Sequence, residues 1–298
     1  MPAHPSSPPA LLPNEPRLLD AARQEALTQR YLQPAQASLL ALFTALRRAC
    51  DPALQRAQPS KLGKPYPLGQ CWEIVHAVEQ QLPRLNAAVL AQGPLAAGYH
   101  ALQTFLANGG ELRHVWGDLR GCYFQNAFLL GSWYLDVAND TVDPTKPAVE
   151  LLPFSDAKLR PIASYAHFAT LATRYWNLTL YPNHLLPALA PYVPLLAVSP
   201  AGVQLHALCD YMLALTCRAA FEPSIVALQA PPMPAELFAA LRTRLPQPLP
   251  ATPGDGRQQA LSACRKARAK GHHQNVAHRN AAVQQALMAI QRLNGTDA

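Results

Sequence analysis

The feature that most constrains the fold is a change of hydrophobic period in the middle of the chain. Residues 112–116, 122–130 and 133–137 are rich in aromatic and apolar residues at short spacing, a pattern typical of β-strands. Gly131 and Ser132 separate the last two runs, and a two-residue link of this kind predicts a tight hairpin. Residues 149–154 add a candidate fourth strand. The sequence therefore predicts a small antiparallel sheet within residues 111–154.

Helical spacing dominates on both sides of this segment. Apolar residues recur every three or four positions before it, in residues 18–32, 35–48, 71–82 and 94–107, and after it, in residues 164–178, 201–220, 258–270 and 277–293. We therefore expect an α+β protein that is predominantly helical, with the small antiparallel sheet near its centre and helices at its C-terminal end.

Composition shifts suggest four segments. Residues 1–16 are rich in proline and serine and are expected to be disordered. Residues 17–250 are expected to form a single globular α+β domain, and the Pro/Gly-rich residues 251–256 a linker. Residues 257–298 form a basic helical tail, because they hold seven Lys and Arg residues against one acid in a chain of net charge +7. The remainder of the chain is close to neutral.

The overall composition excludes several classes of protein. A chain of 298 residues with 50% hydrophobic and 14% charged residues is globular. Its six cysteines form no CxxC pair, which favours a reducing compartment. We find no signal peptide and no apolar run of about 18 residues, so we expect no membrane span and a cytoplasmic protein, with non-classical export left open.

Cofactor motifs are missing from the sequence. The histidines lack the HExxH or HxD spacing that would bring two metal ligands together, and Gly109-Gly110 has no following Lys-Ser/Thr to form a phosphate loop. We expect no metal ion and no cofactor.

Three motifs carry candidate catalytic chemistry. Cys71 follows a Pro-Leu-Gly-Gln turn and opens a predicted helix, a position that lowers a thiol pKa because unpaired backbone N–H groups favour the anion. His114 opens a predicted strand, and Asp136 ends the predicted hairpin. A nucleophile, a base and a carboxylate that orients the base are the parts of a cysteine-dependent acyl-transfer site.

These motifs resemble the transglutaminase-like branch of the papain-type cysteine fold, over roughly residues 66–141. The resemblance rests on Gly-Gln-Cys-Trp at residues 69–72, His-Val-Trp at 114–116 and Trp-Tyr-x-Asp at 133–136, in that order. It implies Cys71 as nucleophile, His114 as base and Asp136 as orienter. It also implies a thioester intermediate, formed from an amide of a protein or peptide substrate and resolved by water or an amine.

The chain departs from the family pattern at two points. Asp136 lies three residues beyond Trp133, whereas the family carboxylate lies an even number beyond, so Asp140 is the alternative third member. No tryptophan precedes the nucleophile to support an oxyanion, which leaves Gln70 or Tyr66 to act with the Cys71 backbone N–H. The candidate substrate contacts are Trp72, Trp116 and Trp133.

A non-catalytic interpretation explains the same residues. Cys71 shares one helical face with residues 74, 75, 78 and 82 and fits an inert core thiol, while His114 fits a hydrogen-bonded strand histidine. The alternative function is a binding or adaptor protein that uses an aromatic sheet surface and the basic tail. In the tail, Arg265, Lys266, Arg268 and Lys270 form a candidate anion-binding site for a polyanion such as RNA. The two functions differ in the expected exposure of Cys71.

Overall fold

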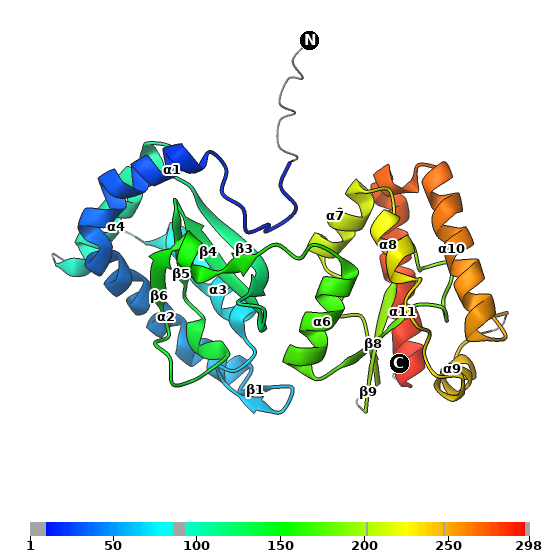
Figure 1. Ribbon diagram of the computed structural model, residues 1–298. Coiled ribbons are helices and arrows are strands. Elements are labelled where there is room, and N and C mark those ends of the chain that lie inside the picture. The colour runs from blue at the N-terminus through cyan, green and yellow to red at the C-terminus, as the bar shows by residue number, and fades with distance from the viewer. Residues whose placement is uncertain (1–9, 86–92, 201, 247, 296–298) are drawn as a thin grey trace, which may run out of the picture. The chain divides into compact units, whose positions relative to one another are not determined.

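The computed structural model describes residues 10–85, 93–200, 202–246 and 248–295, and its contacts divide the chain into two compact units (Figure 1). We call residues 14–161 the sheet unit, and residues 162–298 with residues 1–13 the C-terminal unit. The division differs from the single domain predicted for residues 17–250. Its physical reason is that residues beyond 161 build a hydrophobic core of their own, with the predicted tail as part of it.

The sheet unit confirms the α+β class and the predicted antiparallel sheet. Its five strands lie in the order β6-β5-β4-β3-β7 and pair antiparallel throughout. The predicted hairpin is present, with Leu130 paired to Trp133 across Gly131 and Ser132. The strands are β3 (Leu112–Leu119), β4 (Tyr123–Leu130), β5 (Trp133–Asp136), β6 (Glu150–Pro153) and β7 (Leu159–Arg160), with a separate two-stranded hairpin of β1 (Ser60–Lys61) and β2 (Lys64–Pro65).

Helices cover one face of this sheet. Side chains of α2, α3 and α4 form a single core with Phe128, Leu130, Trp133 and Leu135, which the strand register places on the same face. Val115, Ala127 and Tyr134 belong to a second cluster on the opposite face. The helical segments of this unit are α1 (Ala21–Leu27), the π-helix η1 (Thr28–Leu32), η2 (Gln33–Ala35), α2 (Gln36–Ala57), α3 (Cys71–Gln81), η3 (Leu82–Arg84), α4 (Pro94–Ala107), η4 (Asn139–Thr141) and α5 (Phe154–Ala157).

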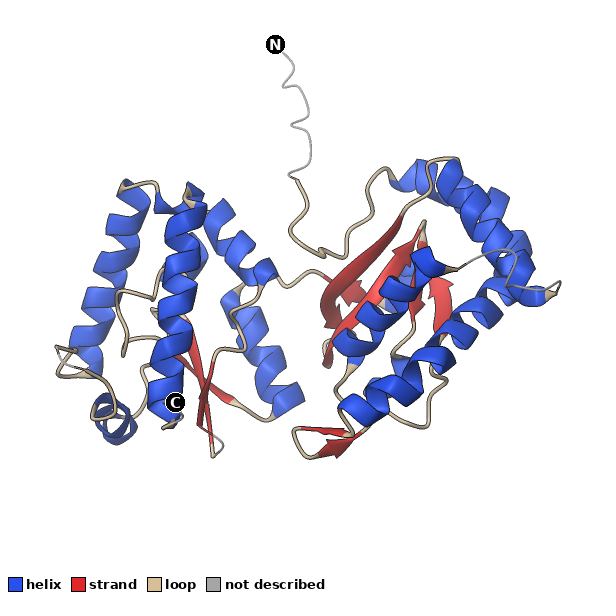
Figure 2. Ribbon diagram, turned by 180° about the vertical axis from the view of Figure 1, so that it is seen from behind, coloured by secondary structure: helices blue, strands red, loops and turns tan. Residues whose placement is uncertain are grey.

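The C-terminal unit contains a second sheet, which the sequence analysis missed. Three antiparallel strands lie in the order β10-β9-β8 (Figure 2). They are β8 (Thr179–Pro182), β9 (Leu195–Ser199) and β10 (Gly202–Gln204). The accompanying helices are α6 (Tyr165–Trp176), α7 (Asp210–Arg218), α8 (Glu222–Ala227), α9 (Ala235–Arg242), α10 (Pro253–Ala269), η5 (His272–Gln274) and α11 (Val276–Asn294). These strands escaped prediction because they are only three to five residues long. Strand β10 corrects the prediction of helix over residues 201–220, of whose described residues only Asp210–Arg218 are helical.

The basic C-terminal segment is helical, as predicted, but it packs into the C-terminal unit. Helix α10 begins at Pro253 with a capping box between Thr252 and Asp255, so the predicted linker 251–256 contains the start of a helix. Cys264 and Leu293 are fully buried, and Leu293 belongs to the main core of the unit. The positive charge lies on the exposed side of docked helices.

The predicted disorder of residues 1–16 falls partly outside the described residues, which begin at residue 10. From there on the structure differs from the prediction. Leu12 and Glu15 are buried, and the Asn14 carbonyl accepts a hydrogen bond of 2.8 Å from the backbone N–H of Trp116. The composition of this segment predicted disorder, but the buried Leu12 side chain and the backbone hydrogen bond to β3 order it.

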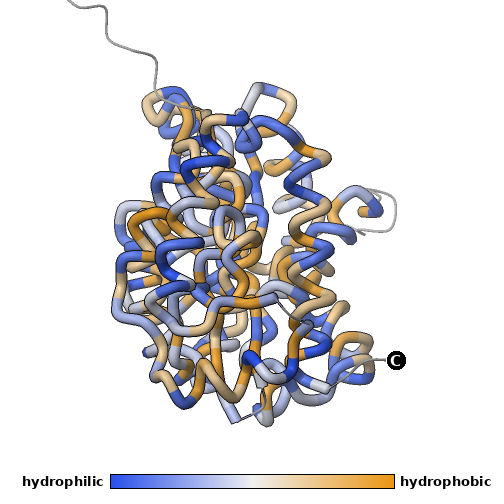
Figure 3. The backbone as a smooth tube through the Cα atoms, turned by 90° about the vertical axis from the view of Figure 1, so that its right-hand side faces the viewer, coloured by the Kyte–Doolittle hydropathy of each residue, from blue (hydrophilic) through white to orange (hydrophobic). Residues whose placement is uncertain are grey.

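No helix within the described residues has both the length and the apolar character needed to cross a membrane. Hydrophilic and hydrophobic residues are interspersed along the coloured part of the tube (Figure 3).

Candidate cysteine site

The loop that precedes Cys71 is hydrogen-bonded to η4, the short helical segment that follows β5. Gly69 has a φ of +74°, a left-handed conformation that suits glycine, and its N–H donates to the Thr141 carbonyl at 2.9 Å. Helix α3 then begins at Cys71, and no side chain caps it. The first-turn N–H groups of α3 therefore remain available to an anion or a polarised carbonyl.

A hydrogen-bond chain links Cys71 to His114 through Asn126. The Asn126 Nδ2 donates to Cys71 Sγ at 3.3 Å, and the Asn126 Oδ1 lies 3.0 Å from His114 Nε2. The Cys71 thiol also donates a weak hydrogen bond to the Phe124 carbonyl oxygen, which lies 4.0 Å from Sγ. The nucleophile and the base predicted from the sequence are therefore neighbours, with an amide between them.

The strand register explains this grouping. In the β3–β4 pairing, Trp116 lies opposite Asn126 and His114 lies opposite Phe128, so the side chains of His114 and Asn126 share the face that packs against α3. Asn126 is itself buried. The role of Asn126 was not predicted from the sequence because the residue lies among apolar side chains in a strand. The only signal was the alternation of side chains along the strands, which puts Asn126 and His114 on the same face of the sheet.

Burial keeps both reactive groups uncharged at neutral pH. Desolvation raises the pKa of the Cys71 thiol above its ordinary value, although the hydrogen bonds of Asn126 oppose the rise. This differs from the lowered thiol pKa expected at a helix N-terminus, because Cys71 is only 7% exposed and loses more solvation than the helix supplies. Desolvation likewise lowers the pKa of His114, which Asn126 and the Glu79 carboxylate oppose.

The carboxylate that lies beside His114 belongs to Glu79, a second residue that was not predicted from the sequence. Its Oε2 lies 4.0 Å from His114 Nδ1 and 3.7 Å from His76 Nδ1. Trp72, His76 and Glu79 follow one stripe of α3, and the Trp72 ring, 53% exposed, stacks on His76 at 5.2 Å. The spacing of one helical turn between these residues was the available signal.

Asp136 lies on the other face of the sheet. Its carboxylate is completely buried and accepts hydrogen bonds from the Tyr134 hydroxyl at 2.7 Å, the Gln125 amide at 2.8 Å and the Ala138 N–H at 2.8 Å. Burial raises the pKa of Asp136 to about 6, although these hydrogen bonds lower it in part. The one-residue offset noted in the sequence thus places Asp136 with Tyr134 and Gln125, and with neither Cys71 nor His114.

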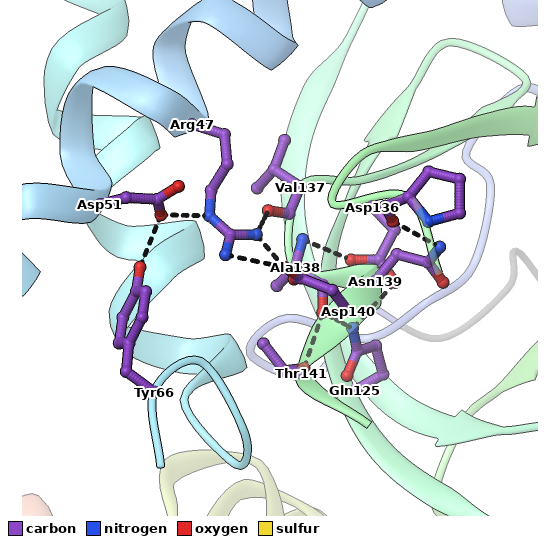
Figure 4. A network of polar contacts seen from close by, with 11 residues as sticks. Arg47, Asp51, Tyr66, Gln125, Asp136, Val137, Ala138, Asn139, Asp140 and Thr141 are labelled. Atoms are coloured by element: carbon purple, nitrogen blue, oxygen red, sulfur yellow. Dashed lines mark hydrogen bonds and ion pairs between the residues drawn. The ribbon is translucent and has the colours of Figure 1, made fainter. Parts of the chain in front are cut away.

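Asp140 is engaged by a buried arginine. Arg47 of α2 contacts both Asp140 oxygens at 2.8 and 3.1 Å, the Val137 carbonyl at 2.8 Å and Asp51 at 2.5 Å (Figure 4). Asp51 in turn accepts a hydrogen bond of 2.6 Å from the Tyr66 hydroxyl. This network holds α2, the loop before Cys71 and the segment after β5 together, and it occupies Tyr66, one of the two expected oxyanion supports.

The remaining candidate residues lie in different environments. Gln70 is fully buried and donates to the Gln58 carbonyl at 3.0 Å. Trp116 is half-buried and stacked on Phe124 at 5.4 Å, whereas Trp133 is buried in the core. In the candidate anion site of the C-terminal unit, Arg265, Lys266 and Lys270 are exposed, while Arg268 is paired with Glu222 and bound to the Ala220 carbonyl.

In the described part of the chain, no group of three or more His, Cys, Asp or Glu residues is arranged to hold a metal ion.

Comparison with known proteins adds no relative. No protein-family model, no curated protein and no solved structure matches this chain.

Proposed function

We propose that the sheet unit carries out cysteine-dependent acyl transfer on an amide, with Cys71 as the nucleophile and His114 as the base. The observation that carries the proposal is the hydrogen-bond chain from Cys71 through Asn126 to His114, at the start of a helix with an uncapped first turn. A thiol, an imidazole and unpaired N–H groups in one place are the components that amide cleavage through a thioester requires.

The reaction starts from neutral groups. His114 takes the Cys71 proton as the sulfur attacks the carbonyl carbon, and the first-turn N–H groups of α3 stabilise the oxyanion. His114 then protonates the departing amine, which leaves a thioester on Cys71. Water or a second amine attacks this thioester, gives its proton to His114 and restores the thiol. The outcome is hydrolysis, deamidation or transamidation, depending on which nucleophile enters.

Asn126 sets a condition on this mechanism. In the resting arrangement His114 donates through Nε2 to the Asn126 oxygen, so this nitrogen has no lone pair directed at the thiol. Rotation of the amide by half a turn exchanges its oxygen and nitrogen, after which Asn126 donates to Nε2 and accepts from the thiol. The second orientation leaves Nδ1 as the proton carrier facing Glu79. Substrate binding then has to move the amide aside so that the sulfur and Nε2 meet.

The pH dependence of turnover tests the proposal. A neutral His114 is required, so the rate of ammonia release from glutaminyl peptides should rise as pH rises through the lowered pKa of His114 and level off near neutrality. Cys71→Ser should remove the activity, while Cys122→Ser, a change at a half-exposed cysteine, should leave it intact. Turnover that survives in Cys71→Ser would refute the proposal.

Non-catalytic binding is the second candidate function, and the observation that favours it is the burial of the thiol. The aromatic sheet surface proposed with it has little exposed area, because Phe124, Phe128, Trp133 and Tyr134 are buried. The exposed cations of α10 remain its candidate contact with a polyanion. Heparin binding that weakens steeply with salt and is lost on changing Arg265, Lys266 and Lys270 to Gln would support this function. Binding that is unchanged in this triple variant would exclude these cations as the site.

A further inference from the structure

The C-terminal unit contains a pocket that the candidate cysteine site does not use. It has a volume of about 590 Å³ and lies among the start of α6, strand β8, the start of β9 and helix α8 with the loop that follows. Helix α6 contacts both α8 and β8, and the three elements lie close together in Figure 1. Volumes of 300–1,000 Å³ are typical of small-molecule sites.

Small and rigid side chains keep the pocket open. Alanines line it from α6 and the segment just before it, from the turn before α8, from α8 itself and from the loop after α8, where larger residues would fill the space. Prolines form much of the remaining wall and supply no N–H donor. The alanines are Ala163, Ala166, Ala169, Ala219, Ala227 and Ala230, and the prolines are Pro182, Pro223, Pro231 and Pro232.

The polar groups of the wall are largely occupied. The Ser164 hydroxyl caps α6 by accepting the His167 N–H at 3.1 Å, and the Tyr165 hydroxyl donates to the Met212 carbonyl at 3.4 Å. Glu222 is the charged residue of the lining, and it is paired with Arg268. A charged ligand would lose hydration here without gaining a partner of opposite charge.

We propose that this pocket binds an uncharged small molecule with an aliphatic chain, such as a fatty alcohol. The walls offer an apolar surface, no free charge and few hydrogen-bond partners, which matches a hydrocarbon chain with a small neutral head. The proposal concerns a different unit from Cys71 and stands or falls independently of the acyl-transfer chemistry.

Fluorescence of the neutral dye N-phenyl-1-naphthylamine with the full-length protein tests the proposal. Binding should saturate at one dye per chain, and 1-dodecanol should displace the dye, whereas dodecylamine should displace it far less well. Val226 lines the pocket and is 54% exposed, so Val226→Asp should fold and should weaken dye binding by about tenfold or more. Val276→Asp, at a 58% exposed valine outside the pocket lining, is the matched control and should bind as the wild type does.

A second variant separates filling of the pocket from a change in polarity. Ala169 is half-buried on α6, and Ala169→Leu should reduce dye binding while the melting curve remains cooperative. Non-saturating dye uptake, or equal binding by the Val226→Asp and Val276→Asp variants, would overturn the proposal. So would sedimentation of the wild type as a dimer whose formation removes the dye site, because the occupant of this face would then be a second copy of the chain.

Discussion

The amide of Asn126 is the contact through which Cys71 and His114 influence each other. Its nitrogen donates to the sulfur, and this hydrogen bond lowers the thiol pKa against the larger effect of burial. Without this amide, burial should raise the pKa of the Cys71 thiol further, because the hydrogen bond that opposes the rise is lost. The protonation state of Cys71 therefore depends on a residue that carries no charge.

Replacing Asn126 by leucine should accordingly make the thiol still harder to ionise. We expect the rate of iodoacetamide labelling at Cys71 to fall at neutral pH and its midpoint to move to higher pH, because only the thiolate reacts. Peptide mapping by mass spectrometry separates Cys71 from Cys122, which serves as the internal reference. A wild-type midpoint below that of a free cysteine would contradict the account of a desolvated thiol.

Asp136 should make stability depend on pH in the opposite sense from most carboxylates. Its folded pKa is about 6, above the ordinary value of 3.8, so the folded protein holds a proton that the unfolded chain releases between these values. Its contribution to stability is fully present below the unfolded pKa and is lost as pH rises through about 6.

Urea unfolding of the wild type and of Asp136→Asn at pH 7 and pH 5 measures this contribution. Between the two pH values the wild type should gain roughly 1 kcal/mol relative to the variant, since one pKa unit corresponds to about 1.4 kcal/mol. Groups that titrate equally in both proteins cancel in the comparison. A difference in unfolding free energy that is the same at both pH values would show that Asp136 is ionised throughout.

Among the elements, those with strong local signals were predicted and those defined by distant partners were not. The hairpin at Gly131-Ser132 and the helix beginning at Cys71 follow from turn chemistry and periodicity. Arg47 gave no such signal, because its partners Val137 and Asp140 lie 90 and 93 residues away. Asn126 and Glu79 meet His114 through strand register and helix packing, which a single sequence does not display.

Arg47 should stabilise the junction between α2 and the segment that follows β5. Its guanidinium is 2% exposed, and loss of one member of a buried ion pair typically costs about 3–5 kcal/mol. We expect Arg47→Met to lower the free energy of unfolding by an amount in this range. Arg48→Met, at the exposed neighbouring arginine, is the control and should change it by less than about 0.5 kcal/mol. Equal stability of the two variants would show that the hydrogen bonds and ion pairs of Arg47 do not stabilise this junction.

At the scale of the whole molecule, hydrophobic periodicity indicated the α+β class, but composition did not indicate the division into two units. The Pro/Gly-rich residues 251–256 resembled a linker, and the charge of residues 257–298 resembled a free arm. Both signals are local, whereas the boundary near residue 161 reflects which apolar side chains meet in each of the two separate cores. The docking of α10 and α11 follows from alanines and single leucines whose partners the sequence does not identify.

Docking of α11 predicts different effects for two leucines on the same helix. Leu293 is fully buried, and Leu293→Ala should destabilise the protein by about 2–5 kcal/mol. Leu287 is 45% exposed, so Leu287→Ala should cost well under half as much. Thermal and urea unfolding of the full-length variants measures the difference. Equal, small effects would mean that residues 257–298 are an uncoupled tail.

The central claim, that Cys71 is a nucleophile activated by His114, is tested most directly by trapping its acyl form. The full-length protein is mixed with p-nitrophenyl acetate at neutral pH, and the acetylated residue is identified by intact mass and peptide mapping. We expect one acetyl group per chain, located on Cys71. It should form at least about tenfold more slowly in the His114→Gln variant, and the Cys71→Ser variant should remain unlabelled. Acetylation that spares Cys71, or that proceeds equally fast in His114→Gln, would contradict it.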